Sequence, residues 1–284
     1  MKICLFNGGR VGVVIGDDVA DVTSVLDRLP SYRYPLPRND VLIAALPTLQ
    51  PAFEAAVVGA PSIPLAEVLL ESPVANPGKL IAAPVNYQAH LDEAIADEAT
   101  FSRAHVRKIQ ETGLFLKATS SLVGASADIV IGLPDRRTDH EVELAVVIGK
   151  TAKNVLAADA LQYVAGYTIG LDITIRGPEE RSLRKSLDSY SVLGPWLVTA
   201  EELGDPSGLD LALDVGDEPR QRANTRDLIM NVGDLIEFAS KFYTLEPGDI
   251  LFTGTPEGVG PIQPGDTIRA SIDRIGALEM AVTQ

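Results

Sequence analysis

Hydrophobic residues at every second position, a pattern typical of half-buried strands, recur along the larger part of the chain. From Leu209 to Val215 every second residue is leucine or valine, and a Gly-Asp pair follows. This spacing predicts a strand that ends in a tight turn. Near the C-terminus, "TIRASI" and "LEMAV" flank Gly276 and predict a terminal hairpin.

Helical spacing is clear in one segment, "TRDLIMNVGDLIEFASKFYTL". Apolar residues recur there at steps of three and four between Leu228 and Ala239. Asn224 or Thr225 has a side chain that can cap the first turn. We therefore predict a helix that begins at Thr225.

Residues 1–75 are predicted to form a small N-terminal α/β domain. "KICLF" and "RVGVVIG" flank the turn "NGG" and predict a hairpin, while "NDVLIAAL" and "PAFEAAVVGA" predict two short helices. The Pro- and Gly-rich segment "SPVANPGKL" marks the boundary to a second domain, residues 76–284. Many short strands and few helices in that domain predict a mixed, β-rich α+β fold.

The composition indicates which kinds of partner and which cellular compartment to expect. The 284 residues are 46% hydrophobic and carry a formal net charge of −15, which disfavours binding to nucleic acid or to an acidic membrane surface. The one cysteine, Cys4, cannot form an intrachain disulfide. No apolar stretch approaches the roughly 20 residues needed to cross a bilayer. We therefore expect a cytoplasmic protein.

Three acids occupy alternate positions in "DHEVELAVVIG": Asp139, Glu141 and Glu143. On a strand they would share one face, which Ala145 and Val147 continue into buried sheet. Like charges in a partly dry site are costly unless a cation is present, and carboxylates suit Mg²⁺ or Mn²⁺. The alternative is a solvent-facing stripe on an edge strand.

A second strand-like segment, "GYTIGLDITIRG", carries Asp172 near its middle. An aspartate in such an apolar run needs a compensating cation or several donors. Arg176, four residues later, could supply an ordinary ion pair. The other reading is that Asp172 completes a three-carboxylate metal site with Glu141 and Glu143.

The chain has three histidines, of which His90 is the candidate base. If its segment is helical, His90 and Glu93 share a face, and a carboxylate partner raises the basicity of an imidazole. The alternative is a surface His–Glu pair. His140 would point to the face opposite the acids, and His105 lies in a charged helical stretch as an expected surface residue.

The segment "TGTPEGVGP", residues 253–261, holds three glycines directly after a predicted strand. It could present backbone N–H groups and the Thr255 hydroxyl to a small anion, or it could be a plain tight connection. It is not a phosphate-binding P-loop, because no Gly-Lys-Ser/Thr follows. No dinucleotide fingerprint and no paired-cysteine metal motif occurs in the sequence.

Taken in order, six segments resemble the fumarylacetoacetate hydrolase superfamily: "NYQAHLDEA", "FLKATSSLVG", "DHEVELAVVIGK", "GYTIGLDITIRG", "RKSLDSYSVLGPW" and "GDILFTGTPEGVGP". The match covers roughly Leu80 to the C-terminus, and the leading unit resembles the N-terminal domain of many bacterial members. The resemblance implies mixed β-sheets rolled around a core, assembled as a homodimer.

The resemblance also implies functional roles for individual residues. It implies that Glu141, Glu143 and Asp172 bind Mg²⁺ or Mn²⁺, with Ca²⁺ as a third candidate. It implies that His90 and Glu93 activate water on a segment that orders over bound substrate. Lys185 matches the lysine that approaches the reacting oxygen, and further residues are expected around the substrate: Lys117, Arg176, Glu179, Gly254 and Thr255.

Three departures from the family pattern surround the expected substrate. Glu179 stands where members with acylpyruvase activity commonly have glutamine, and the link from Asp172 to Lys185 is shorter. The chain between His90 and Lys117 is longer and includes a charged helical insert. These changes bear on the identity of the substrate more than on the metal site.

The implied activity is hydrolysis of a C–C bond in a 2,4-dioxo acid. His90 would deprotonate water for attack on the distal carbonyl, and a pyruvate-like enolate would leave. Isomerisation, decarboxylation or hydration of a related 2-oxo acid at the same site are alternatives. A metal-containing binding protein without turnover is a more remote one, which the His90–Glu93 pair argues against.

Overall fold

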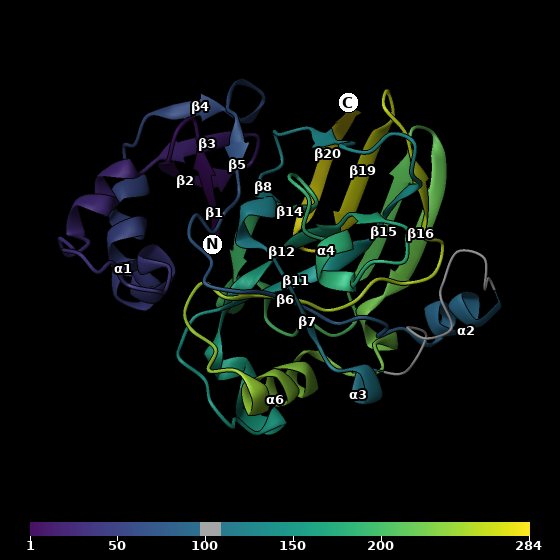
Figure 1. The fold of residues 1–284 in the computed structure, drawn as a ribbon. Helices are drawn as coiled ribbons and strands as arrows, with labels where there is room; N and C mark the ends of the chain where they lie inside the picture. The colour runs from purple at the N-terminus through teal and green to yellow at the C-terminus, as the bar shows by residue number, and fades with distance from the viewer. Residues whose placement is uncertain (97–108) are drawn as a thin grey trace.

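The computed structural model describes residues 1–96 and 109–284, whose strands form three sheets (Figure 1). The largest sheet has twelve strands in the main order β4-β3-β2-β1-β14-β12-β11-β17-β6-β7, with β5 beside β1 and β8 beside β14. Its strands are β1 (Lys2–Phe6), β2 (Arg10–Ile15), β3 (Asp18–Asp21), β4 (Ser62–Pro64), β5 (Leu70–Glu71), β6 (Leu80–Ala82), β7 (Phe115–Lys117), β8 (Leu122–Val123), β11 (Val142–Ile148), β12 (Val164–Asp172), β14 (Ser191–Thr199) and β17 (Ile250–Phe252).

The two smaller sheets and the helices complete the architecture. The three-stranded sheet contains β13 (Thr174–Ile175), β10 (Thr138–His140) and β18 (Gly260–Ile262). The five-stranded sheet contains β16 (Glu218–Asn224), β15 (Asp210–Val215), β19 (Thr267–Ile272), β20 (Gly276–Thr283) and β9 (Ile129–Val130). The α-helices are α1 (Val41–Val57), α2 (Gln88–Ala96), α3 (Ile109–Thr112), α4 (Arg181–Arg184), α5 (Ala200–Leu203) and α6 (Val232–Phe242). The 3₁₀ turns are η1 (Thr23–Arg28), η2 (Leu65–Glu67), η3 (Thr119–Ser121), η4 (Ala157–Tyr163) and η5 (Thr225–Asp227).

The predicted hairpins are confirmed. The strands β1 and β2 pair antiparallel across the glycine turn, and β19 pairs with β20 at the C-terminal end of the chain. The strand predicted from Leu209 to Val215 is β15, which pairs with β16 across the Gly216-Asp217 turn. These local pairings follow directly from the period-two pattern.

Alternate residues of β11 face two separate hydrophobic cores. Leu144 and Val146 belong to the larger core, whereas Ala145 and Val147 belong to the second core together with Phe53 of α1. Because side chains alternate along a strand, Glu143 lies on the same face as Ala145. Glu143, a candidate metal ligand, therefore lies near the start of a central strand, on the face that Ala145 and Val147 continue into the second core.

A single helix, α1, replaces the two short helices that were predicted. It runs from Val41 to Val57 through Pro47 and Pro51, and the Asp40 side chain caps its start. Each proline removes a helical hydrogen bond. The helix nevertheless continues because its apolar stripe, which includes the fully buried Phe53, packs against the second core.

The helix α6 begins at Val232, so the predicted start at Thr225 is wrong. Asn224 does act as a cap, but only of the short turn η5. A second and better cap follows, in which Asn231 and Asp234 form a reciprocal capping box. This box satisfies the first N–H groups of α6, and the apolar spacing upstream of it belongs to an irregular segment.

The N-terminal strands extend the large sheet, since β1 pairs with β14 at Lys2↔Val198 and Ile3↔Leu197. In Figure 1 the N-terminal unit, drawn in purple and blue, lies beside the remainder of the molecule. The second core includes residues from both parts, among them Phe53 and Leu193. The boundary near residue 75 stays a prediction.

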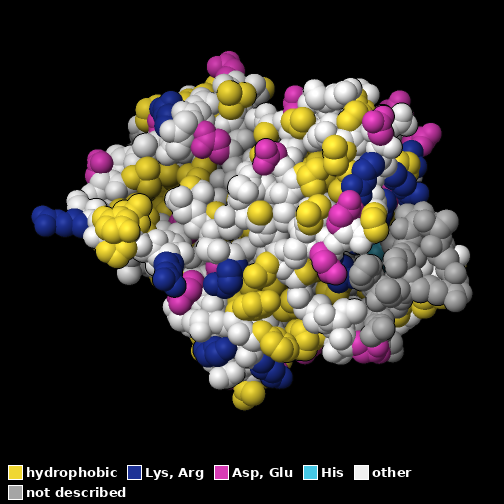
Figure 2. Space-filling model, viewed as in Figure 1, with side chains coloured by type: hydrophobic (Ala, Val, Ile, Leu, Met, Phe, Trp, Pro, Cys, Tyr) yellow, Lys and Arg dark blue, Asp and Glu magenta, His cyan; other side chains and the backbone are white. Residues whose placement is uncertain are grey.

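On the face shown in Figure 2, basic and acidic side chains are interspersed over the surface. Hydrophobic side chains gather over the N-terminal unit and in the region of α6 in the same view. Within residues 1–96 and 109–284, no helix has the length and hydrophobicity needed to cross a lipid bilayer.

Candidate active site

Three carboxylates come together where β11 begins and β12 ends. The antiparallel register pairs Glu143 with Gly170, and the Asp172 N–H donates to the Glu141 carbonyl at 2.9 Å. One carboxylate oxygen from each of Glu141, Glu143 and Asp172 lies within 4.8 Å of the others. All three side chains are buried, and β11 lies between β12 and β17. The alternative of a solvent-facing stripe on an edge strand is therefore wrong.

Asp139 does not join this group, although it alternates with the two glutamates. The strand is interrupted at Glu141, and Asp139 belongs to β10 in the three-stranded sheet. Its carboxylate accepts from Arg137 Nε at 2.7 Å and from Arg176 Nε at 2.6 Å. Arg176 also places its Nη2 3.3 Å from Glu141 Oε1, so that it links Asp139 to the carboxylate cluster without making Asp139 one of its members.

The charges of the cluster fit a divalent cation. Burial, together with the negative charges of Asp172 and Glu141, raises the pKa of Glu143 well above its ordinary value. Burial also acts to raise the pKa of Glu141, but the positive charges of Lys185 and Arg176 outweigh it and lower that pKa. A hard ion with oxygen ligands would allow all three groups to ionise. The donor set is thus suited to Mg²⁺ or Mn²⁺.

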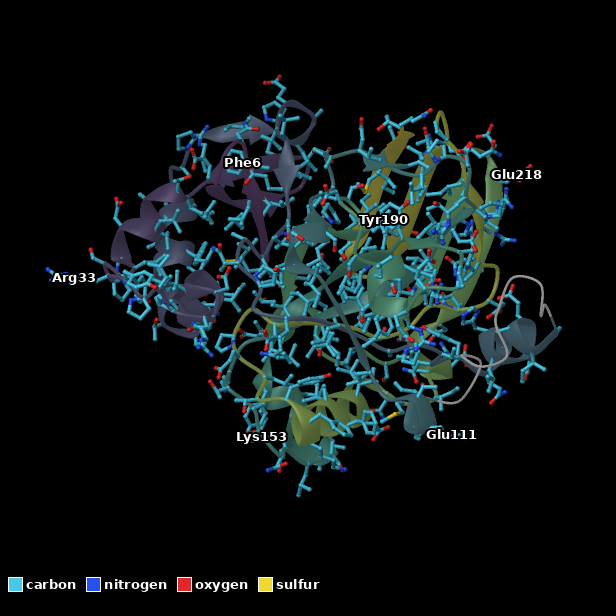
Figure 3. The ribbon with its side chains drawn as sticks, in the orientation of Figure 1. Phe6, Arg33, Glu111, Lys153, Tyr190 and Glu218 are labelled. Carbon is cyan, nitrogen blue, oxygen red and sulfur yellow. The ribbon has the colours of Figure 1, made fainter. Side chains whose placement is uncertain are left out.

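Two buried lysines balance part of this negative charge. Lys185 Nζ lies 2.7 Å from Glu141 Oε2 and 2.8 Å from Asp172 Oδ2. Lys117 Nζ donates to Asp172 Oδ1 and, at 2.7 Å, to the backbone carbonyl of Tyr190, which lies in the interior of the molecule (Figure 3). Among the described residues Asp172 is therefore paired with these lysines and not with Arg176, which rules out that alternative.

The predicted base and its partner are in contact on α2. His90 Nδ1 lies 3.0 Å from Glu93 Oε2, and the His90 side chain is buried rather than on the surface. Burial acts to raise the pKa of Glu93, but its hydrogen bonds to His90 and Gly258 outweigh burial and lower it. Glu93 is therefore an acceptor that holds the proton of His90 on Nδ1, which leaves Nε2 basic.

The glycine-rich turn connects the metal cluster to the base. Gly254 N–H donates to Glu143 Oε2 at 2.6 Å, and Gly258 N–H donates to Glu93 Oε1 at 3.0 Å. The Thr255 hydroxyl donates to the Val142 carbonyl at 2.9 Å. These donors are therefore engaged by groups of the protein itself, and the turn holds the carboxylate cluster and the dyad in a common frame.

Comparison with known proteins places this geometry in a family. The family model described as fumarylacetoacetate (FAA) hydrolase C-terminal matches residues 79–283. The chain belongs to the fumarylacetoacetate hydrolase family. It is 57% identical to a maleylpyruvate hydrolase of Aquipseudomonas alcaligenes over 284 residues, which covers 99% of each chain.

Solved structures and more distant relatives agree with this membership. The crystal structure of maleylpyruvate hydrolase from Sphingobium sp. SYK-6 with manganese(II) and pyruvate matches with a TM-score of 0.86 and 42% identity, covering 100% of this chain and 99% of that one. A mitochondrial oxaloacetate tautomerase of Homo sapiens is 34% identical over 244 residues, 81% of this chain and 74% of its own.

The fold, the type of enzyme and the type of cofactor that the resemblance implied are confirmed. The fold is the mixed-sheet architecture of the fumarylacetoacetate hydrolase family. The protein is a metal-dependent hydrolase of the acylpyruvate type, and its cofactor is a divalent metal. The acids predicted to hold that metal are the group that the fold assembles.

Other candidate residues lie around this centre with partners of their own. Glu179 accepts two hydrogen bonds from Arg136, at 2.8 and 2.7 Å. His140 Nδ1 lies 3.2 Å from Gln221 Oε1, and His140 is not a member of the carboxylate cluster. His105 and the charged insert lie outside the described residues. The substrate contacts expected of Lys117, Arg176, Glu179, Gly254 and Thr255 stay predictions.

Gln221 is a residue of the site that the sequence analysis missed. Its side chain is fully buried on β16, where Oε1 accepts from Val142 N–H at 3.0 Å. Its Nε2 donates to the Thr255 hydroxyl at 2.8 Å and to the Pro256 carbonyl at 2.9 Å. Gln221 thus ties the metal-binding strand to the glycine-rich turn. Gln221 pairs with Leu213 across the β15–β16 hairpin, and the alternating apolar residues of β15 were the available signal that this position faces inward.

Proposed function

We propose that this enzyme hydrolyses the C–C bond of maleylpyruvate, or of a closely similar 2,4-dioxo diacid, to pyruvate and a second acid. The observation that carries the proposal is the contact between the His90–Glu93 pair, in which His90 is buried, and the turn that also binds Glu143. A general base and a metal cluster are thereby held together by one segment. The full-length similarity to a maleylpyruvate hydrolase supports the choice of substrate.

Glu141, Glu143 and Asp172 would hold the divalent ion, which when bound supplies a Lewis acid for the 2-oxo acid head of the substrate. Lys185 Nζ, 2.7 Å from Glu141 Oε2, adds a positive charge beside the oxygen on which negative charge grows. Maleylpyruvate hydrolase from Sphingobium sp. SYK-6 forms a complex with both manganese(II) and pyruvate, which supports a substrate with a pyruvate-like head group.

In the proposed reaction, His90 Nε2 removes a proton from water while Glu93 keeps the Nδ1 proton in place. The oxygen of that water attacks the carbonyl carbon at position 4 of the substrate. The bond between carbons 3 and 4 then breaks, and its electron pair leaves with the pyruvate fragment as an enolate. The proton held by His90 returns to carbon 3, so that the reaction consumes one water and releases pyruvate and maleate.

The test is product analysis by mass spectrometry with Mn²⁺ and maleylpyruvate. The proposal predicts equal amounts of pyruvate and maleate, with one oxygen from labelled water in maleate. Isomerisation is the second candidate, favoured by the similarity to an oxaloacetate tautomerase. A product of unchanged mass would decide for that reaction and against hydrolysis.

The proposed setting is a cytoplasmic homodimer with a catalytic domain of residues 76–284. The family match, which begins at residue 79, supports the proposed boundary. The single buried cysteine, Cys4, supports a reducing compartment. Sedimentation analysis of the purified protein would test the dimer.

A further inference from the structure

One buried arginine beside the metal cluster has no acidic partner among the residues that the structure describes. Arg184 ends the short helix α4, and its side chain is only 7% exposed. Its Nε donates to the Glu179 carbonyl at 2.8 Å and its Nη1 to the Ile175 carbonyl at 3.5 Å. No carboxylate within the part of the chain that the structure describes forms an ion pair with it. A desolvated cation without a counter-ion is costly.

Other basic residues around Arg184 do form ion pairs with carboxylates. Arg137 and Arg176 share Asp139, and Arg136 binds Glu179. Lys117 and Lys185 bind the metal-cluster carboxylates. Each of these cations is therefore neutralised by the protein, whereas within residues 1–96 and 109–284 the hydrogen-bond partners of Arg184 are backbone carbonyls.

The guanidinium of Arg184 still has donors available. Its Nη2 makes no hydrogen bond to any described residue, and that atom is not sealed from solvent. A planar guanidinium with a free edge is suited to a bidentate contact with a carboxylate. Two backbone contacts fix the group in place before any ligand arrives.

The position of Arg184 relates it to the substrate. The next residue, Lys185, places its Nζ between Glu141 and Asp172. The carbonyl that accepts from Arg184 Nη1 belongs to Ile175, three residues after Asp172. Arg184 is thus held next to the metal cluster while contacting none of its carboxylates.

We propose that Arg184 determines specificity for a dicarboxylic substrate by binding the carboxylate distal to the 2-oxo acid head. The inference rests on the proposed function and refines it. The head group is bound at the metal cluster, and the second negative charge of the substrate supplies the counter-ion that Arg184 lacks. A monocarboxylic acylpyruvate offers no such partner.

The kinetic test compares two substrates that undergo the same cleavage, maleylpyruvate and the monoacid acetylpyruvate. In Arg184→Met, kcat/KM for maleylpyruvate should fall by about 10- to 100-fold, the value of a charge-assisted hydrogen-bond pair. The value for acetylpyruvate should stay within about twofold of its wild-type level. The control is Arg269→Met, which removes an arginine from an exposed ion pair with Glu279 and should change neither value. Equal losses on both substrates would show that Arg184 only braces the loop, and would overturn the proposal.

A binding test decides the question even if Arg184→Met fails to fold or neither acid is cleaved. The inhibitors 2-oxoheptanedioate and 2-oxoheptanoate differ only in the terminal carboxylate. Wild-type protein loaded with Mn²⁺ should bind the diacid about 10- to 100-fold more tightly, and Arg184→Lys, which keeps the charge but loses the planar fork, should reduce that ratio. Equal affinities in the wild type would refute the role of Arg184. Absence of cleavage with an intact ratio would instead refute the proposed reaction alone.

Discussion

At the scale of single residues, the site is a set of buried charges that the protein only partly neutralises. Lys117 and Lys185 pair with Asp172 and Glu141, whereas Glu143 accepts only the N–H of Gly254 among described hydrogen-bond donors. Burial and like charge consequently raise the pKa of Glu143. A doubly charged ion would remove this repulsion, and it would do so at the point where the substrate head group is proposed to bind.

A substitution of His90 distinguishes the role of the general base from the role of the metal. In His90→Ala the carboxylate cluster is untouched, so Mn²⁺ affinity measured by calorimetry should remain at the wild-type level. The rate constant for hydrolysis should fall by about 10²–10⁴-fold, because general base catalysis contributes on this scale. Full turnover by this variant would show that His90 is not the base.

The residues of the site differ in how well a sequence predicts them. Alternation along a strand was enough to place Glu141 and Glu143 together, and helical spacing was enough to bring His90 to Glu93. The ion-pair partners of the charged residues were harder to predict from the sequence. Whether Arg176 would pair with Asp172 or with Asp139 depends on the interruption of the strand at Glu141, and no local pattern indicates that interruption.

At the scale of elements, the site depends on contacts between segments that are far apart in sequence. Gln221 of β16 bonds the Val142 N–H at the start of β11 and the Thr255 hydroxyl of the glycine-rich turn. Asn86, just before α2, likewise donates to the Thr253 carbonyl at 2.8 Å. The sheet, the turn and the helix that carries His90 are therefore positioned by buried side-chain amides.

Removal of the Gln221 amide should be costly because it leaves several buried polar groups unpaired. Gln221→Leu should lower the free energy of unfolding by about 2–4 kcal/mol, measured by urea denaturation. The matched control is Arg222→Leu on the same strand, where the side chain is 49% exposed and the change should be within about 0.5 kcal/mol. Equal stability of the two variants would show that Gln221 does not brace the site.

The elements themselves could be predicted where the determinants are local. Hairpins at β1–β2 and β19–β20 follow from alternation and turn residues. The start of α6 could not be placed from apolar spacing, because the capping box at Asn231 competes with the earlier cap at Asn224. The continuity of α1 through Pro47 and Pro51 depends on tertiary packing of its apolar stripe, which overrides the local effect of proline.

At the scale of the whole molecule, the N-terminal unit is structurally joined to the catalytic part. The strand β1 adds to β14, and the second core combines Phe53 of α1 with Ala145 and Leu193 of the central strands. The face of the sheet that carries Glu143 is therefore covered by the N-terminal unit. Separate folding of the catalytic part would expose this apolar face to water.

Deletion of residues 1–75 tests this coupling. The truncated chain should aggregate or bind a hydrophobic dye strongly, because the edge of β14 and the second core lose their cover. Size-exclusion chromatography and dye fluorescence, with the full-length protein as reference, provide the measurements. A truncated protein that is monodisperse and melts at the full-length temperature would contradict the prediction.

The central claim is that Glu141, Glu143 and Asp172 bind a divalent ion at the reaction centre. Diffraction from crystals grown with Mn²⁺, recorded at the manganese absorption edge, tests it most directly. The account predicts a single strong anomalous peak within coordination distance of an oxygen from each of these three side chains. A map without a peak among them, from crystals whose enzyme is active in the same solution, would contradict it.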